Sequence, residues 1–210
     1  MPTIINSLKN IVRIIVRSIA KALNKVFPGI DPNIITVVGL IAHIPIALLV
    51  ADNQLVLAGI LLVVFGLFDT LDGELARLQN RESLSGRLLD SITDRMKEVF
   101  IYGGIAYYFI ENQNPKLAFI TLLASGAALI ISYINAWGEA VLSEKISKER
   151  KNKLLRTGLM TFEIRITTII IGLLVNQLAV IITALAVLSW FTLLQRLLNV
   201  LDIARAYDKN

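Results

Sequence analysis

The sequence predicts an all-α integral membrane protein, and two observations support this. Of the 210 residues, 55% are hydrophobic and only 18% are charged, whereas soluble domains carry about 25% charged residues. Several apolar runs approach the roughly 20 residues that cross a bilayer as a helix. In a chain this apolar, the net charge of +5 favours anionic membrane lipids over nucleic acid as partners. Because cysteine is absent, we expect no disulfide and no thiol chemistry.

An amphipathic helix is predicted over residues 1–28, before the first long apolar run. Basic residues recur at every fourth position from Lys9 to Lys25, and isoleucine, leucine and valine occupy many of the positions between them. This pattern is typical of a helix that lies in the membrane interface. The helix would anchor the chain and set its topology, or would contact a phosphate-bearing substrate directly. Pro28 and Gly29 then break it.

Six apolar segments follow, and we expect them to form one transmembrane bundle over residues 33–200, so that 1–210 is a single domain. They run roughly over residues 34–50, 55–68, 88–110, 117–133, 164–175 and 178–200. The second and fifth segments are short, and each extends into a polar flank. The third is charged through its first half, which must therefore face protein or water rather than lipid.

The distribution of basic residues predicts the orientation of these spans. All but one of the 21 lysines and arginines lie in the N-terminal stretch, in or beside the connections after spans two and four, or at the C-terminal end. The exception is Lys116. Since cytoplasmic loops are enriched in basic residues, six spans with both termini in the cytoplasm account for this bias. We expect a multi-pass protein of the cytoplasmic membrane.

Four aspartates stand at the junction of the second and third spans. Asp69 and Asp72 share one helix face, and Asp90 and Asp94 share another. Converging carboxylates repel each other in a low dielectric, so either some are protonated or cations compensate them. Oxygen ligands without histidine or cysteine favour Mg²⁺, Mn²⁺ or Ca²⁺. With Arg77 available to hold a phosphate through paired donors, the cluster predicts a pyrophosphate site. Two ions there would stabilise both oxygens of an in-line displacement.

This stretch resembles the signature of the CDP-alcohol phosphotransferase family. The chain matches it at every defined position, reading Asp69-x2-Asp72-Gly73-x2-Ala76-Arg77-x8-Gly86-x3-Asp90-x3-Asp94. The resemblance implies that the four aspartates hold Mg²⁺, as one or two ions with Mn²⁺ as a substitute. It also makes Asp94 the general base, and implies a homodimer. The residues that it places at the CDP-linked lipid are Asn33, Ile34, Ile35, Thr36, Gly73, Ala76, Arg77, Ser83 and Gly86.

The activity implied by the resemblance is transfer of a phosphatidyl-type group from the CDP-linked lipid to a hydroxyl of a small phosphorylated alcohol, with release of CMP. Residues 34–39 and 89–95 look most like members that use inositol phosphate. Arg165 and Arg196 are candidate anchors for the phosphate of this acceptor, or else members of structural ion pairs. Where those members carry a basic residue, this chain has Asn135. Glycerol 3-phosphate is therefore the alternative acceptor.

Two other classes of function fit parts of the sequence. A divalent-cation transporter could use the acidic cluster as a transit site, and a scaffold would need no site at all. Transport requires polar residues in both halves of the membrane, whereas nearly all of them lie toward one side here. A scaffold would leave the aspartate spacing without a purpose. The sequence therefore favours an enzyme.

Overall fold

The computed structural model describes residues 2–142 and 158–208, without the side chains of residues 2–13, 69, 142 and 208. Within these ranges every regular element is an α-helix, as the composition predicts. The helices in chain order are α1 (Pro2–Val26), α2 (Pro32–Ala51), α3 (Leu55–Gly66), α4 (Phe68–Leu78), α5 (Leu84–Glu111), α6 (Pro115–Leu142), α8 (Phe162–Leu174) and α9 (Leu178–Asp208).

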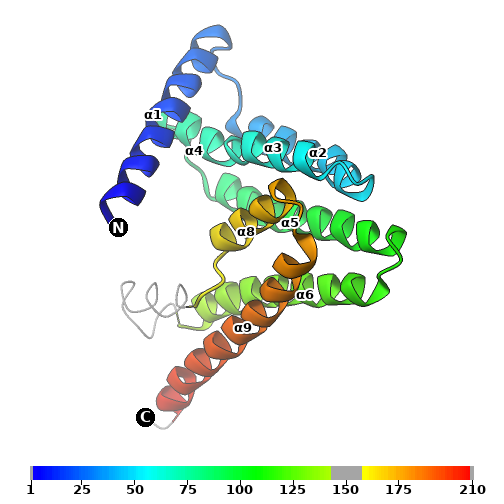
Figure 1. Ribbon diagram of the computed structural model, residues 1–210. Helices are drawn as coiled ribbons and strands as arrows, with labels where there is room; N and C mark the ends of the chain where they lie inside the picture. Colours follow the sequence, from blue (N-terminus) through cyan, green and yellow to red (C-terminus); the bar gives the residue numbers. More distant parts are fainter. Residues whose placement is uncertain (1, 143–157, 209–210) are drawn as a thin grey trace.

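The long helix α5 lies in the middle of the molecule (Figure 1). The α2, α3 and α4 helices lie on one side of it and α6 on the other, and α9 packs along α6. The α8 helix packs against α3 and α9, and α1 lies across α4 at the outer edge. The α5 helix therefore packs directly against α2 and α6, and the other helices are attached through their own neighbours.

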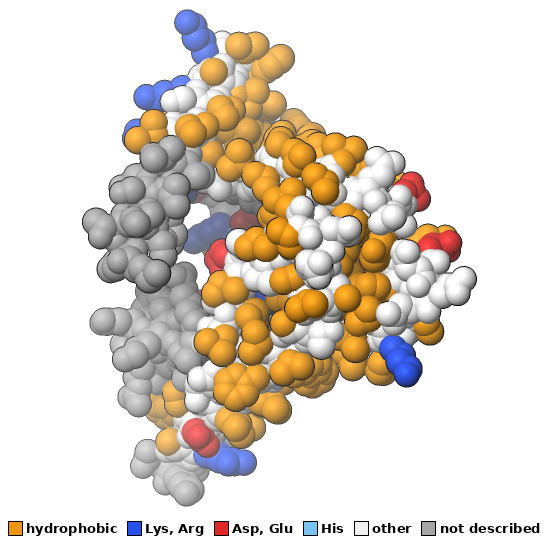
Figure 2. All heavy atoms as spheres, in the orientation of Figure 1, with side chains coloured by type: hydrophobic (Ala, Val, Ile, Leu, Met, Phe, Trp, Pro, Cys, Tyr) orange, Lys and Arg blue, Asp and Glu red, His pale blue; other side chains and the backbone are white. Residues whose placement is uncertain are grey.

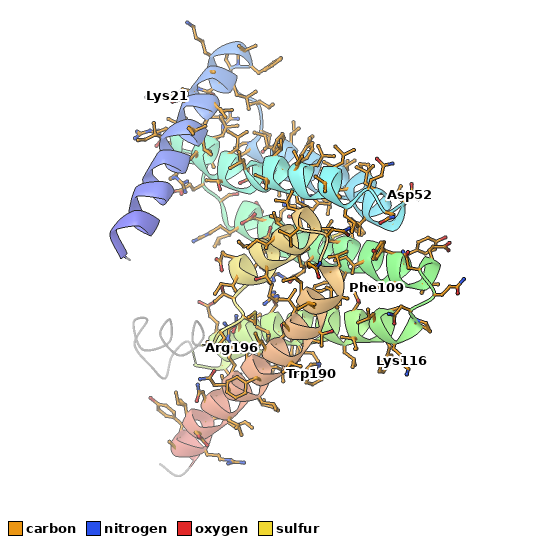
Figure 3. All side chains as sticks on the ribbon, in the orientation of Figure 1. Lys21, Asp52, Phe109, Lys116, Trp190 and Arg196 are labelled. Carbon is orange, nitrogen blue, oxygen red and sulfur yellow. The ribbon has the colours of Figure 1, made fainter. Side chains whose placement is uncertain are left out.

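Local signals in the sequence explain where the helices begin and turn. Asp31 caps α2 by accepting a hydrogen bond from the backbone N–H of Asn33 at 2.9 Å, and a proline occupies the first helical position. Tight turns with a left-handed residue follow α2 and α5, at Asn53 and Gln113. These turns lie at one end of the bundle, where Figure 3 also places Asp52 and Lys116. The chain therefore returns repeatedly to the opposite end.

Four helical stretches of the described chain are long and apolar enough to cross a membrane: Pro32–Ala51, Leu55–Leu78, Pro115–Val141 and Leu178–Tyr207. The second runs through α3 and α4. Two other expected spans fall on α5, which carries charged residues through its first half, and on α8, which has 13 residues. Large apolar side chains cover much of the outer face of the helices (Figure 2). The protein is thus an all-helical, multi-pass membrane protein.

The α1 helix is attached to the helix that carries the first two signature aspartates. Val16 and Ala20 of α1 are buried in a small apolar cluster with Leu71 and Leu75 of α4. Beside this cluster, the side-chain amide of Gln79 donates to the side chain of Asn24 and to a backbone carbonyl of the α1–α2 connection. Because α4 is packed on two sides, by α1 and α2, its position relative to the start of α2 is fixed.

Candidate active site

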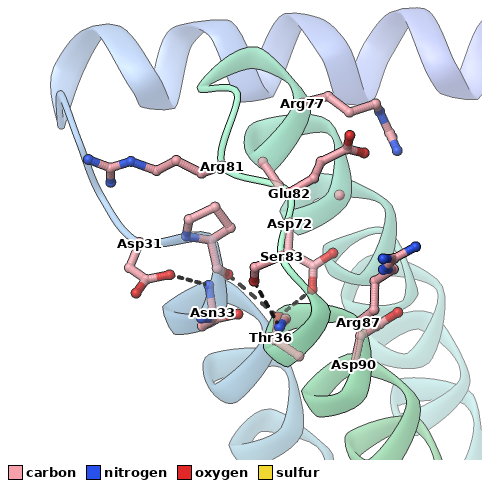
Figure 4. Close-up of a pocket in the computed structure, with 14 residues that line it drawn as sticks. Asp31, Asn33, Thr36, Asp72, Arg77, Arg81, Glu82, Ser83, Arg87 and Asp90 are labelled. Carbon is pink, nitrogen blue, oxygen red and sulfur yellow. Dashed lines mark hydrogen bonds between the residues drawn. The ribbon is translucent and has the colours of Figure 1, made fainter.

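A cavity of about 610 Å³ lies where α4 meets the beginnings of α2 and α5 (Figure 4). Its lining comes from the cap and first turns of α2, from α4, and from the connection that leads into α5. The lining residues are Asp31, Pro32, Asn33, Thr36, Asp72, Gly73, Ala76, Arg77, Arg81, Glu82, Ser83, Gly86, Arg87 and Asp90. In Figure 2 both acidic and basic side chains are visible in the hollow beside α1. Charges of both signs therefore meet in one cavity.

The cavity collects most of the residues that the sequence assigns to the CDP-linked lipid. They are Asn33, Thr36, Gly73, Ala76, Arg77, Ser83 and Gly86. Two others, Ile34 and Ile35, are on α2 but are absent from the lining: Ile34 is exposed, and Ile35 is buried in the cluster beneath α1. Asp72 and Asp90 join the cavity from α4 and α5. The structure thus brings together predicted site residues that are up to 57 positions apart, from Asn33 to Asp90.

A hydrogen bond between two side chains joins the α2 and α4 walls. Asp72 is buried, and its Oδ2 accepts from the hydroxyl of Thr36 at 2.5 Å. Thr36 is also buried. A buried carboxylate requires such partners, since an unsatisfied one is costly. The bond orients the carboxylate of Asp72 and ties α2 to the helix that carries it.

The first turn of α5 forms another wall. The hydroxyl of Ser83 caps this helix by accepting from the backbone N–H of Gly86 at 3.0 Å. A Cβ atom at Gly86 would lie 3.0 Å from that hydroxyl oxygen and 3.3 Å from Oδ1 of Asn33. A side chain at this position would crowd both polar groups, and glycine avoids that contact. Backbone N–H groups at a helix N-terminus favour anionic groups, phosphates among them.

Basic side chains surround the cavity, and sequence reasoning singled out only one of them as a ligand. Arg77 lies with its guanidinium over Gly73, and its Nη2 is 3.1 Å from Oε1 of Glu74. Arg81 and Arg87 also line the cavity. They fall in the two variable stretches of the signature on either side of Gly86, so the motif gave no signal for them. The available signal was that two more arginines follow Arg77 within ten residues and could also bind an anion.

Asp94 lies one turn after Asp90 on the same face of α5, outside the lining of the cavity. Its carboxylate is 3.5 Å from Nζ of Lys97, which is buried, and 4.0 Å from Nη2 of Arg95. Asp69 is predicted to bind metal, and its side chain lies outside the part of the chain that the structure describes. Among the side chains that are described, no three acidic or histidine residues gather closely enough to hold a metal ion. The donor set, carboxylates alone, nevertheless has the chemistry that Mg²⁺ and Mn²⁺ prefer.

The two candidate acceptor anchors lie apart from the cavity lining. Arg165 is fully buried and pairs with Glu98 of α5. Arg196 is also buried, and its Nη1 donates to Oδ1 of Asn135 on α6 at 2.9 Å. The structure therefore does not bring either arginine into the cavity that holds the other predicted ligands.

The family follows from comparison with known proteins. Residues 30–196 match the family model described as CDP-alcohol phosphatidyltransferase. The chain belongs to this family. The match begins after α1 and includes every residue of the cavity. The resemblance seen in the signature is thus confirmed over most of the chain.

Several phospholipid synthases are similar to this family member. Archaetidylinositol phosphate synthase of Pyrococcus horikoshii is 33% identical over 169 residues, which are 80% of this chain and 82% of the relative. Phosphatidylinositol phosphate synthase of Corynebacterium glutamicum is 30% identical over 131 residues, covering 61% of this chain and 59% of the relative.

Solved structures of one such enzyme have the same fold. The crystal structure of Mycobacterium tuberculosis phosphatidylinositol phosphate synthase with CDP-DAG bound has a TM-score of 0.78 at 27% identity, covering 89% of this chain and 93% of that one. The same enzyme in complex with manganese and citrate has a TM-score of 0.77 at 28% identity, covering 88% of each chain.

Proposed function

We propose that this protein transfers a phosphatidyl-type group from a CDP-linked lipid to a hydroxyl of inositol phosphate and releases CMP. The observation that carries the proposal is the cavity, whose lining joins signature residues of α4 and α5 with the first turns of α2. Relatives that make phosphatidylinositol phosphate or archaetidylinositol phosphate support inositol phosphate as the acceptor. The structure with CDP-DAG supports a CDP-linked lipid as the donor.

In this proposal the CDP group binds in the cavity. The guanidinium of Arg77 and the N–H groups at the start of α5 bind the diphosphate, since both present donors to an anion. Asn33 and Thr36 contact the nucleotide from the α2 side. Gly73 and Gly86 keep the two walls clear of side chains at the points where the ligand approaches. The lipid tails extend from the cavity into the bilayer.

We further propose that Asp69, Asp72, Asp90 and Asp94 bind Mg²⁺, as one or two ions, with Mn²⁺ as a substitute. Two of them, Asp72 and Asp90, already share the cavity, and the manganese complex of the mycobacterial enzyme supports a divalent ion in such a fold. When bound, the metal would neutralise the charge that develops on the departing CMP. Thr36 orients the carboxylate of Asp72 for this role.

Asp94 is the proposed general base. It takes the proton from the acceptor hydroxyl, whose oxygen then attacks the β-phosphorus of the CDP-linked lipid while the bond to CMP breaks. Arg196 is the proposed anchor for the phosphate of the acceptor. Lys97 and Arg95 lie beside Asp94, and their positive charges hold its carboxylate in place.

The proposed setting is the cytoplasmic membrane, crossed six times by one domain of residues 1–210, with both termini in the cytoplasm. At about 1.5 Å per residue, the 28 residues of α5 reach well beyond the roughly 30 Å of a hydrocarbon core. The 13 residues of α8 need the polar flank before them to do the same. Residues 1–28 form the interfacial helix, 33–200 the bundle, and two copies form a homodimer.

The test is release of CMP by the purified protein in detergent, with CDP-diacylglycerol or its ether counterpart, inositol phosphate and Mg²⁺. We expect turnover that EDTA abolishes and Mn²⁺ restores. The Asp94→Asn variant should lose about 10²- to 10⁴-fold in kcat, the usual contribution of a general base. The matched control is Asp202→Asn, because Asp202 is exposed on α9, and it should leave kcat unchanged.

The same assay contains the results that would refute the proposal. No CMP release by well-folded wild-type protein with any acceptor, or release that EDTA does not affect, would rule out the metal-dependent transferase. Turnover with another phosphorylated alcohol but not with inositol phosphate would show that the proposed acceptor is wrong, while the transferase reaction itself would stand. Full activity of Asp94→Asn would show that Asp94 is not the general base.

A further inference from the structure

A buried ion pair joins α5 to α8 one turn beyond Asp94. Glu98 and Arg165 are each 1% exposed. They meet at two points, Nε to Oε1 at 2.6 Å and Nη2 to Oε2 at 2.9 Å. The remaining guanidinium nitrogen, Nη1, donates to the backbone carbonyl of Met160 at 2.9 Å. A two-point contact between arginine and a carboxylate fixes orientation as well as distance.

The same carboxylate connects this pair to the proposed base. Arg95 donates from Nη1 to Oε2 of Glu98 at 3.0 Å, and its Nη2 lies 4.0 Å from Oδ2 of Asp94. The guanidinium of Arg95 also stacks over the ring of Phe162, the first residue of α8, at 4.3 Å. The start of α8 and the turn of α5 that bears Asp94 are therefore held by one cluster of charges.

All three guanidinium nitrogens of Arg165 are already engaged with buried protein acceptors. Each of its guanidinium nitrogens already donates to Glu98 or to the Met160 carbonyl. If an anion displaced Glu98, a carboxylate would remain buried without its main partner, which is strongly unfavourable. Arg165 also lies outside the lining of the cavity. These contacts argue against the direct anchoring role that the sequence suggests for it.

We propose that Glu98 and Arg165 are positioning residues, whose pair sets the start of α8 against the Asp94 turn of α5. The α8 helix packs mainly against α3 and α9, so this cluster is what ties it to the helix with the catalytic residue. Loss of the pair would let the start of α8 move away from the turn of α5 that bears Asp94. This inference rests on the proposed transferase function, because that function gives Asp94 its role.

The test combines kinetics with a distance that does not depend on activity. Arg165→Lys keeps the charge but loses the two-point contact, and Glu98→Asp keeps the charge on a shorter side chain. Because the chain contains no cysteine, spin labels can be attached to Leu88→Cys on α5 and Ile164→Cys on α8, both exposed positions. The control is Arg205→Lys, in an exposed ion pair far along α9.

We expect Arg165→Lys and Glu98→Asp to lower kcat about 10- to 100-fold, the usual cost of a misplaced catalytic group. The KM for the acceptor should change less than roughly threefold, and the distance distribution between the labels should broaden or shift. Arg205→Lys should change neither quantity. If Arg165→Lys does not fold, Glu98→Asp carries the test by itself.

The opposite result has a distinct pattern. An unchanged label distance, with a KM for the acceptor raised tenfold or more and kcat intact at saturation, would make Arg165 a direct anchor and overturn the inference. If the wild-type protein has no transferase activity, the proposed function fails. The label distances would then still show whether the pair positions α8, because they need no substrate.

Discussion

A close approach between α2 and α5 gives a sharp test of how this bundle is packed. At Gly104 a Cβ atom would lie 3.0 Å from the Cα and the carbonyl carbon of Ala47, and closer still to its carbonyl oxygen. These are backbone atoms, which cannot move aside by changing rotamer. Gly104→Ala must therefore push the helices apart. The adjacent Gly103 has open space around the same position, so Gly103→Ala is a matched control on the same helix.

The size of the effect follows from two opposing contributions. Inserting a methyl group into a packed interface costs about 1–3 kcal/mol, and contact with backbone favours the upper end. Alanine gains up to about 1 kcal/mol over glycine in helix propensity. Gly104→Ala should thus lose about 2 kcal/mol of stability, while Gly103→Ala should gain up to about 1 kcal/mol. A change of 1 kcal/mol shifts the Tm of a chain of this size by about 2–4 °C. The Tm of Gly104→Ala should therefore fall by about 4–8 °C, and that of Gly103→Ala should rise by up to about 4 °C.

Thermal unfolding of the two variants in detergent, followed through the fluorescence of Trp137 and Trp190, measures this difference. Because both variants share the propensity gain, the difference between them isolates the helix contact. The walls of the cavity belong to α2 and α5, so Gly104→Ala should also weaken binding of the CDP-linked lipid. Equal Tm values for Gly103→Ala and Gly104→Ala would show that the two helices are not packed as described here.

Two further predictions concern the walls of the cavity. Thr36→Val keeps the side-chain volume but removes the hydroxyl that donates to Asp72. The Mg²⁺ concentration for half-maximal turnover should rise about 3- to 10-fold, the worth of one hydrogen bond, and an unchanged Mg²⁺ titration would contradict this role. Gly86→Ala brings a methyl group to 3.0 Å from Oγ of Ser83 and 3.3 Å from Oδ1 of Asn33. The KM for the CDP-linked lipid should rise about fivefold or more with kcat within twofold of wild type; a kcat that falls more than the KM rises would refute a binding role.

The sequence was sufficient for the fold class and for most of the cavity. Hydrophobic run lengths depend only on local composition, so they predicted an all-helical membrane protein without any knowledge of packing. The signature fixes Asp72, Arg77, Gly86 and Asp90 at set offsets on two consecutive helices. Both helices pack against α2, and the cavity that they share with its first turns takes in all four residues. The signature therefore predicted which residues line the cavity, although it did not predict that α2 completes it.

Other features depend on contacts between segments far apart in the chain. The sequence could not show that Arg81 and Arg87 line the cavity, because their direction depends on how the connection into α5 folds. It also could not identify the actual partner of Arg165. The sequence offered a structural ion pair as one role for this arginine, and the structure forms that pair with Glu98, 67 residues away.

What the sequence by itself determined is thus the class of protein, the apolar character of its long helices and the spacing of its signature aspartates. Those properties arise from periodicity, composition and short spacing, which act within one or two helices. Only the tertiary structure decided which charges pair in the interior and which face the cavity. A buried charge must find its partner wherever packing brings one, and that choice is made by the whole bundle rather than by the neighbouring residues.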